Sequence, residues 1–202
     1  MKRKVLIFFS LIMFCGAVFA VDPPPLAMLK NTSSQMIHEL DKNLSQIKRN
    51  DRLVYNLVNR ILVPHFALAA MSQGVVGREN WQQATPALQQ QFIAEFTRYV
   101  IRTYSSALQS YDGETIRFYP IRGYNPSVSR VQVNSDILQK DGPSINLQYR
   151  LLNNGGNWLI YDFSVDGISI VQNYRSQFAG VLRQGGLTKL VQQLQQRNAG
   201  FR

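Results

Sequence analysis

The chain has 202 residues, a formal net charge of +10 and an apolar fraction of 45%. That length suits one domain with a substantial core. The positive charge invites a nucleic-acid hypothesis, but after the N-terminal segment no basic run exceeds Lys48-Arg49. We therefore expect the charge to serve anionic lipid headgroups or acidic protein partners.

Residues 1–20 have the pattern of a cleaved secretory signal peptide. A basic start, Lys2 to Lys4, precedes an apolar run, Val5 to Val18, that is too short to span a bilayer comfortably. Ala20 is the small residue that a signal peptidase requires, so we predict cleavage after it. An uncleaved anchor is the rival interpretation, which the prolines at 23–25 disfavour because they cannot extend a helix.

The single cysteine, Cys15, lies inside this segment, so the predicted mature chain has no disulfide and depends on its core for stability. A lipidated Cys15 is disfavoured because Phe14 stands where a small residue is expected. Cleavage removes three basic residues and no acidic one. The mature chain then has 19 Lys and Arg against 12 Asp and Glu, a charge of +7.

Residues 26–111 are predicted to be helical. After a proline-rich linker, apolar residues three or four apart predict one long helix from Leu26 to Ile47. A second helix is expected from Asp51, as N-cap, to Leu62, and a short third one from His65 to Gln73. Thr85-Pro86 is a strong helix start, followed by an unusually aromatic stripe: Phe92, Phe96, Tyr99, Tyr104 and Tyr111.

Residues 115–165 change to a period of two, which predicts strands with one apolar face. Asn153 to Gly156 is a hairpin turn composition that accepts positive φ. The expected apolar face of this curved antiparallel sheet comprises Ile116, Phe118, Val131, Val133, Ile145, Leu147, Tyr149, Leu151, Leu159, Tyr161, Phe163 and Val165.

C-terminal helices are predicted over residues 169–197. Ser169 is the expected cap of a helix that ends at Gly185-Gly186, and Leu187 to Gln196 forms the last one. Residues 21–202 thus read as a single α+β domain with helices packed on one face of an antiparallel sheet. We expect that face to border an apolar cavity.

Few residues suit catalysis. His38 and His65 lie far apart and the mature chain lacks cysteine, so no metal site is expected; no phosphate loop and no G-x-S-x-G elbow is present. Asp162 and Asp166, near Tyr161 and Tyr174, are the best acid–base candidates. Alternation directs Asp162 away from the pocket, and Asp166 suits a role in the Gly167 turn, so we predict no catalytic residue, no cofactor and no enzyme activity.

Several arginines lie on predicted helices or strands, among them Arg98, Arg102, Arg150 and Arg175. Such charges ordinarily form a solvated face. Arg98 and Arg102 are four residues apart and could form a basic edge beside the aromatic stripe. A phosphate group or an acidic docking partner would be expected at such an edge.

A series of short motifs runs along the whole predicted mature chain: Leu62-Val-Pro-His-Phe66, Gly77-Arg-Glu-Asn-Trp81, Ala84-Thr-Pro86, Tyr149-Arg-Leu151, Gly156-Asn-Trp158, Tyr161-Asp162, Val165-Asp-Gly-Ile-Ser169, Asn173-Tyr-Arg-Ser-Gln-Phe178 and Gly185-Gly-Leu187, with Phe92, Tyr104 and Tyr111. The most specific of these are the Ala-Thr-Pro helix start and the block that ends at Phe178. In these motifs the sequence resembles the MlaC family of periplasmic phospholipid shuttles, also called the toluene-tolerance auxiliary component, over essentially the whole mature chain.

The resemblance implies an NTF2-like sheet and helices that enclose acyl chains, in a soluble periplasmic carrier that maintains outer-membrane lipid asymmetry. It also implies exchange with an outer-membrane lipoprotein–porin complex and an inner-membrane ABC transporter bearing MCE domains, with phospholipid as cargo. We expect a monomer. The family motifs are scaffold positions and identify no lipid contact.

The lipid-lining residues are therefore inferred from their apolar pattern. From the helices we predict Val76, Trp81, Phe96, Tyr99, Val100 and Tyr104, and from the sheet and its exit Leu147, Tyr149, Tyr161, Phe163, Ile168, Val171 and Tyr174. Two other hypotheses stay open. An NTF2-like enzyme acting on an apolar small molecule would use Asp162 or Asp166, and a protein-only adaptor would have no cavity and no cargo.

Overall fold

The computed structural model describes residues 21–200, so the predicted signal peptide and its cleavage position lie outside the described residues. The first helix, α1 (Pro24–Lys42), includes two of the prolines expected in a linker, because proline in the first turn forfeits no helical hydrogen bond. The single helix predicted up to Ile47 is wrong. It breaks at Asn43, and a short α2 (Leu44–Ile47) follows.

The next helix, α3 (Asp51–Ile61), is present as predicted but is capped differently. Asn50, and not Asp51, is the N-cap, and its side-chain oxygen accepts a hydrogen bond from the Leu53 amide at 2.9 Å. A 3-10 turn, η1 (Val63–His65), follows. Phe66 then forms an isolated parallel bridge with Ile160, which delays the helix expected from His65.

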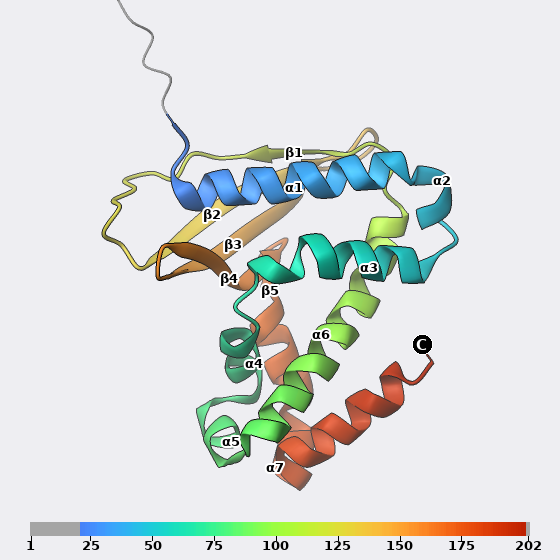
Figure 1. Ribbon diagram of the computed structural model, residues 1–202, viewed down its shortest axis with the longest axis vertical. Coiled ribbons are helices and arrows are strands. Elements are labelled where there is room, and N and C mark those ends of the chain that lie inside the picture. Colours follow the sequence, from blue (N-terminus) through green and yellow to red (C-terminus); the bar gives the residue numbers. More distant parts are fainter. Residues whose placement is uncertain (1–20, 201–202) are drawn as a thin grey trace, which may run out of the picture.

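Three helices follow this bridge: α4 (Leu68–Val76), α5 (Arg78–Gln83) and α6 (Pro86–Gln109). The short α5 was not predicted. The predicted cap of α6 is confirmed, since the Thr85 hydroxyl accepts a hydrogen bond from the Leu88 amide at 3.2 Å. Figure 1 shows α1 lying across the sheet with α3 beside it, while α4, α5 and much of α7 gather at the opposite end and α6 connects the two regions.

The sheet is antiparallel throughout, in the order β1 (Thr115–Phe118), β2 (Arg130–Leu138), β3 (Ile145–Asn154), β4 (Asn157–Val165) and β5 (Ile168–Ser169). The α+β class is confirmed, and the open curved sheet fits the NTF2-like description. The last strand, β5, was not predicted. It returns beside β4 immediately before the final helix.

A β-bulge makes the alternation predicted for β4 wrong. Tyr149 pairs with Phe163 whereas Leu151 pairs with Ile160, so one extra residue stands in β4 between these pairs. Directly paired residues share a face, which places Ile160 with Phe163 on the apolar side. Tyr161 lies instead near Arg130, whose guanidinium carbon is 5.5 Å from the centre of its ring. Leu159 and Tyr161 therefore leave the face that Trp158 and Ile160 join.

The last helix, α7 (Ile170–Asn198), combines the two helices that were predicted, with a kink at Gly185 and Gly186. The predicted cap is confirmed, because the Ser169 hydroxyl accepts from the Gln172 amide at 3.1 Å. Gly186 has φ +60, a conformation that side chains disfavour, so the change of direction occurs where glycine permits it.

Three apolar clusters hold these elements together. One joins α1, α2 and α3 to the end of α6 through residues such as Ile47, Val54 and Ile101. A second lies between α4, α6 and α7 and includes Phe92, Phe96 and Phe178. The third packs Leu26 and Leu29 of α1 against Val133, Leu151, Trp158 and Ile160 of the sheet.

The crossing of α4 over α7 depends on a missing side chain at Gly74. A Cβ atom added there would lie 2.8 Å from Cγ1 of buried Val171. Gly74→Ala should therefore lower the free energy of unfolding by about 1–3 kcal/mol, the usual cost of overpacking. Gly180→Ala on α7 is the matched control, since an added Cβ meets nothing within 4 Å. Its expected gain is about 0.5–1 kcal/mol, the difference in helix propensity. Urea unfolding of both variants measures the contrast, and a stabilised Gly74→Ala would contradict the close crossing.

Candidate functional site

The interior between α6 and α7 is an aromatic seam. Phe96 on α6 meets Tyr174 and Phe178 on α7 with ring centres 5.2 and 6.1 Å apart, both edge-to-face. Phe92 stacks on Phe96 at 5.4 Å, and Tyr99 approaches Tyr174 at 5.8 Å. Such geometry suits a large apolar surface that side chains keep out of water.

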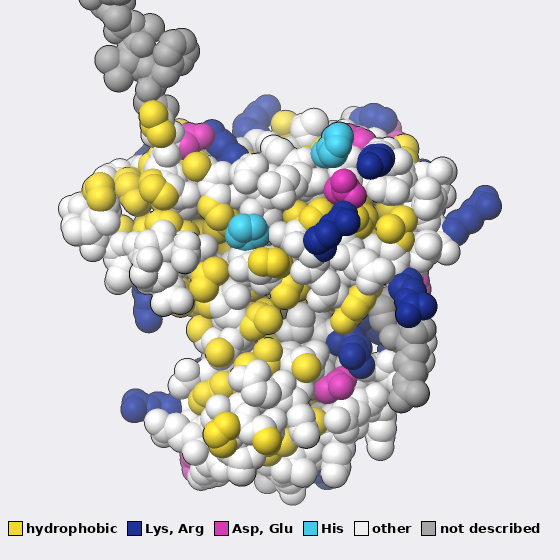
Figure 2. Space-filling view, viewed as in Figure 1, with side chains coloured by type: hydrophobic (Ala, Val, Ile, Leu, Met, Phe, Trp, Pro, Cys, Tyr) yellow, Lys and Arg dark blue, Asp and Glu magenta, His cyan; other side chains and the backbone are white. Residues whose placement is uncertain are grey.

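This seam continues into the apolar face of the sheet. Phe66 and Phe163 meet edge-to-face at 6.0 Å, and both pack against the helical cluster and against the cluster of the sheet and α1. The apolar interior thus extends from α7 to α1 without a polar layer at this contact. Figure 2 shows hydrophobic side chains gathered across the middle of the visible face, between the two ends of the molecule.

Tyrosine hydroxyls give the seam a few polar groups. Burial raises the pKa of the Tyr174 phenol to about 12, and a hydrogen bond with Thr103 partly opposes that rise. Burial also raises the pKa of Tyr104, with a hydrogen bond to Tyr174 acting in the opposite direction. These phenols remain neutral at any physiological pH, so the interior carries hydrogen-bonding groups without charge.

The raised pKa of Tyr174 predicts a change in alkaline behaviour. As pH rises, the unfolded chain ionises at the ordinary value near 10 before the folded one does, so this stabilising contribution is complete below about pH 10 and is lost towards pH 12. We expect Tyr174→Phe to remove one late-titrating phenol in an absorbance titration of the folded protein. Tyr111, whose pKa burial and Asp41 also raise to about 12, is another late-titrating phenol, and Tyr111→Phe is the matched comparison. A Tyr174 phenol titrating near 10 would mean that water reaches it.

Most residues predicted to line a lipid site lie on this interior. Val76, Phe96, Val171 and Tyr174 are buried in the helical cluster, while Trp81, Tyr99, Val100, Tyr104 and Phe163 pack against it. Tyr149 packs in the sheet cluster, and Leu147 lies on the same sheet face two residues away.

Two of the predicted lining residues lie elsewhere. Tyr161 is on the opposite sheet face because of the bulge, beside Arg130. Ile168 is 62% exposed on β5 and contributes to no described cluster. Phe66, Phe92 and Phe178 lie on the same apolar interior and were not among the residues predicted to line a lipid site. Phe92 and Phe178 carried a signal in their helical spacing, whereas Phe66 joins the interior through a bridge that no periodicity predicts.

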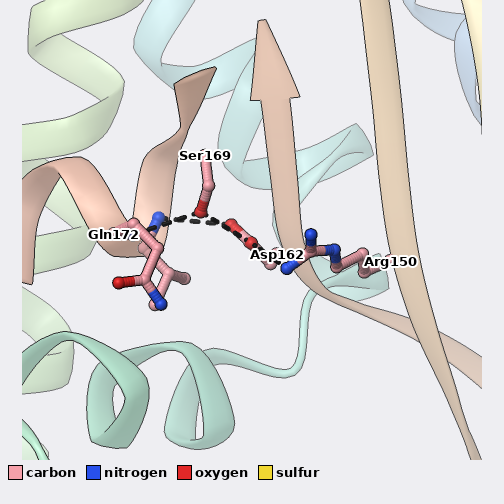
Figure 3. Close-up of polar contacts among 5 residues, drawn as sticks. Arg150, Asp162, Ser169 and Gln172 are labelled. Carbon is pink, nitrogen blue, oxygen red and sulfur yellow. Dashed lines mark hydrogen bonds and ion pairs between the residues drawn. The ribbon is translucent and has the colours of Figure 1, made fainter. Parts of the chain in front are cut away.

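Asp162 is a buried acid, 3% exposed, and makes several polar contacts (Figure 3). Its carboxylate accepts hydrogen bonds from the Ser169 hydroxyl at 2.7 Å and the Val171 amide at 3.2 Å, and Arg150 lies 3.4 Å away. The side chain lies on the face opposite Phe163, as alternation predicts, yet it is buried because the start of α7 covers it. The contacts with Ser169 and Val171 fasten β4 to the start of α7, and the contact with Arg150 joins β4 to β3.

Asp166 has a structural role of the kind predicted. It adopts φ 47, and its carboxylate accepts a hydrogen bond from the Asn146 amide at 2.9 Å while its own amide donates to the Asn146 carbonyl.

The two arginines of the predicted basic edge, Arg98 and Arg102, make contacts within the protein. Arg98 lies 3.8 Å from Glu95, and Arg102 donates to the Arg197 carbonyl.

Two cavities open beside the seam. One of about 490 Å³ lies between α4, α5 and α7, and another of about 260 Å³ lies between the two arms of α7.

Among residues 21–200, no group of three or more His, Cys, Asp or Glu is placed to hold a metal ion. Over the same residues, no helix is both long and apolar enough to cross a membrane.

Comparison with known proteins identifies relatives along most of this chain. The family model described as MlaC protein matches residues 30–196. Toluene tolerance protein ttg2D from Pseudomonas putida is 28% identical over 162 residues, covering 80% of this chain and 74% of that protein. The intermembrane phospholipid transport system binding protein MlaC from Haemophilus influenzae is 22% identical over 198 residues, covering 93% and 91%.

A solved structure agrees in fold as well as sequence. The phospholipid-binding protein from Ralstonia solanacearum, determined in complex with a phospholipid, superposes with a TM-score of 0.81 at 30% identity and covers 88% of this chain and 98% of that one. The family model, the two relatives and this structure agree, and the chain belongs to the MlaC family.

Proposed function

We propose that this protein is a phospholipid carrier that holds acyl chains in the apolar interior shared by α1, α4, α6, α7 and the sheet. The observation that carries the proposal is the likeness to the Ralstonia solanacearum protein, which was solved with a phospholipid and which this chain matches over 98% of its length. The continuous aromatic interior through Phe66 and Phe163 supports the same conclusion, since acyl chains need an uninterrupted apolar path.

Carrying a phospholipid requires the interior to open. Cavities of roughly 300–1,000 Å³ enclose drug-sized ligands. A diacyl phospholipid is larger than such a ligand and needs a larger cavity. The cavity beside the seam measures about 490 Å³. Acyl chains would therefore enter by separating packed side chains such as Phe96, Tyr174 and Phe178.

The cost of exposing acyl chains to water should make lipid exchange slow when the carrier acts without a partner. Burying two acyl chains, roughly 30 methylenes at ~0.8 kcal/mol each, recovers about 24 kcal/mol relative to water. A bilayer offers a similar amount, so loading from a membrane is nearly balanced, while passage of bare chains through water is strongly opposed. Exchange should then need a docked partner that shields the chains.

We therefore expect loaded protein to keep its lipid when mixed with bare phospholipid vesicles, over times in which a docked partner would exchange it. Fluorescently labelled lipid on the purified protein, followed by transfer of the signal to vesicles, measures this retention. An unloaded vesicle sample with free labelled lipid is the control for spontaneous transfer. Rapid release into bare vesicles would contradict dependence on a partner.

The cellular setting belongs to the same proposal. The predicted signal peptide supports a periplasmic location. The expected partners are an outer-membrane lipoprotein–porin complex and an inner-membrane ABC transporter with MCE domains, with outer-membrane lipid asymmetry as the result. The positive charge of the chain favours acidic docking surfaces. Direction would be set by these partners and by ATP hydrolysed in the transporter.

No enzymatic role is proposed. Asp162 and Asp166, the only acids that sequence reasoning offered for catalysis, direct their described hydrogen bonds to backbone and side-chain groups of the fold. Solvent extraction of purified mature protein, followed by mass spectrometry, tests the carrier directly. Stoichiometric phospholipid is the expected result. A protein that never yields lipid would favour the adaptor or enzyme hypotheses.

A further inference from the structure

The cavity of about 490 Å³ joins two segments that are nearly a hundred positions apart in the sequence. The end of α4 and the start of α5, Val75 to Asn80, form one side. Arg175, Ala179, Leu182 and Arg183 of α7 form the other. The guanidinium of Arg175 lies over the junction of α4 and α5, where Nη2 would be 3.8 Å from a Cβ atom added to Gly77.

The floor of this cavity is apolar and continuous with the interior. Val75, Val76 and Leu182 are buried members of the cluster that also contains Phe96, Tyr174 and Phe178. A molecule that entered at this cavity would therefore meet the outermost layer of the proposed acyl-chain site. Apolar groups of the same molecule could be buried there as soon as α4 and α7 part.

The rim carries an excess of positive charge. Arg78, Arg175 and Arg183 line the cavity and are exposed, and none of the ion pairs found within residues 21–200 involves them. One acid, Glu79, shares the lining, and its carboxylate accepts a hydrogen bond from Gln83 at 3.4 Å. Three guanidinium groups against one carboxylate leave the rim suited to an anion, and the planar guanidinium matches phosphate oxygens well.

We propose that this cavity binds the phosphodiester of an anionic glycerophospholipid, with its acyl chains passing over the apolar floor into the interior. The inference rests on the proposed carrier function and adds where the headgroup lies and which charge it prefers. The apolar floor distinguishes the ligand from a free phosphate ester, because only a lipid has groups to bury against Val75, Val76 and Leu182. The arginine rim distinguishes it from an uncharged lipid.

Competitive loading tests the proposal. Delipidated mature protein is mixed in detergent with equal amounts of phosphatidylglycerol and diacylglycerol that have identical chains. The detergent is then removed, and the protein is re-isolated, extracted and analysed by mass spectrometry. We expect the wild type to take up phosphatidylglycerol in preference by about tenfold or more, as charge-assisted hydrogen bonds to phosphate imply. The triple variant Arg78→Gln, Arg175→Gln, Arg183→Gln should lose the preference and still load diacylglycerol.

The matched control removes the same net charge elsewhere, with Arg49→Gln, Arg52→Gln and Arg122→Gln, and should keep the wild-type preference. A control that loses it equally would assign the effect to net charge and overturn the site. Added glycerol phosphate should leave the ratio unchanged; if it abolished the preference, the cavity would be a site for soluble phosphate esters.

Different outcomes contradict the headgroup site and the carrier function. Equal loading of both lipids by the wild type would overturn the headgroup site and leave the carrier function intact. Loading of neither lipid would contradict the carrier function itself.

Discussion

Replacing Asp162 by Ala is expected to lower the free energy of unfolding by about 3 kcal/mol, because buried donors then lose their acceptor. Asp162 accepts from the Ser169 hydroxyl and from the amide of Val171, which belongs to the first turn of α7. Those first-turn amides have no partner within the helix, and a negative charge beside them is favourable. The nearby Arg150 is partly exposed and should add little.

Urea unfolding with a circular dichroism signal measures this loss. Asp162→Asn keeps an oxygen for the Val171 amide, so a smaller loss is expected. Asp141→Ala, at an exposed acid in the turn between β2 and β3, is the matched control and should change little. If Asp162→Ala were as stable as the wild type, Asp162 would not fasten β4 to α7. Folded Asp162→Asn should also carry the wild-type amount of phospholipid, because the described contacts of Asp162 are with Arg150, Ser169 and Val171 of the fold.

Structural features that depend on a few neighbouring residues could be predicted from the sequence. Thr85 and Ser169 cap their helices as predicted, since a hydroxyl before a helix has a ready backbone donor. Alternation also placed Val133, Tyr149 and Leu151 on one face. It failed at Tyr161, because a bulge is a property of the pairing of two strands and one strand's pattern does not contain it.

The candidate site was predictable to a lesser extent. The aromatic stripe of α6 was visible in its spacing, and much of it does lie on the interior. Its contact with the sheet depends on Phe66, which reaches Phe163 only because the chain after η1 bridges to β4. Arg175 was interpreted as part of a solvated helix face. It is exposed, but the packing of α7 against α4 also places it at a cavity with Arg78.

A disulfide between α4 and α7 is expected to abolish lipid loading reversibly. The two helices cross so closely at Gly74 that an added Cβ would lie 2.8 Å from Val171 Cγ1. Disulfides join Cβ atoms roughly 3.5–4.5 Å apart, so Gly74→Cys combined with Val171→Cys should form one. Replacing valine by cysteine also removes one of the two γ atoms that crowd Gly74. The predicted mature chain has no other cysteine to interfere.

The crossing adjoins both the arginine-rimmed cavity and the aromatic seam, since Val75 and Val76 on α4 line the cavity and Val171 and Tyr174 on α7 lie in the seam's cluster. Acyl chains that enter at the cavity must separate these helices. The disulfide would hold the two helices together and reduce the fraction of molecules in the open state. The apparent affinity for lipid falls in proportion to that fraction, so oxidised protein should load at least about tenfold less lipid than reduced protein.

Mass spectrometry of extracted lipid, with and without reductant, measures the difference, and each single cysteine variant is a control for oxidation alone. Protein that is loaded first and oxidised afterwards should retain its cargo, because the same closed crossing then opposes escape. Equal loading of the oxidised and reduced double variant would mean that lipid enters the interior by another route. The remaining candidate is then the other side of the interior, where α1 covers the sheet and Leu26 and Leu29 would have to move instead.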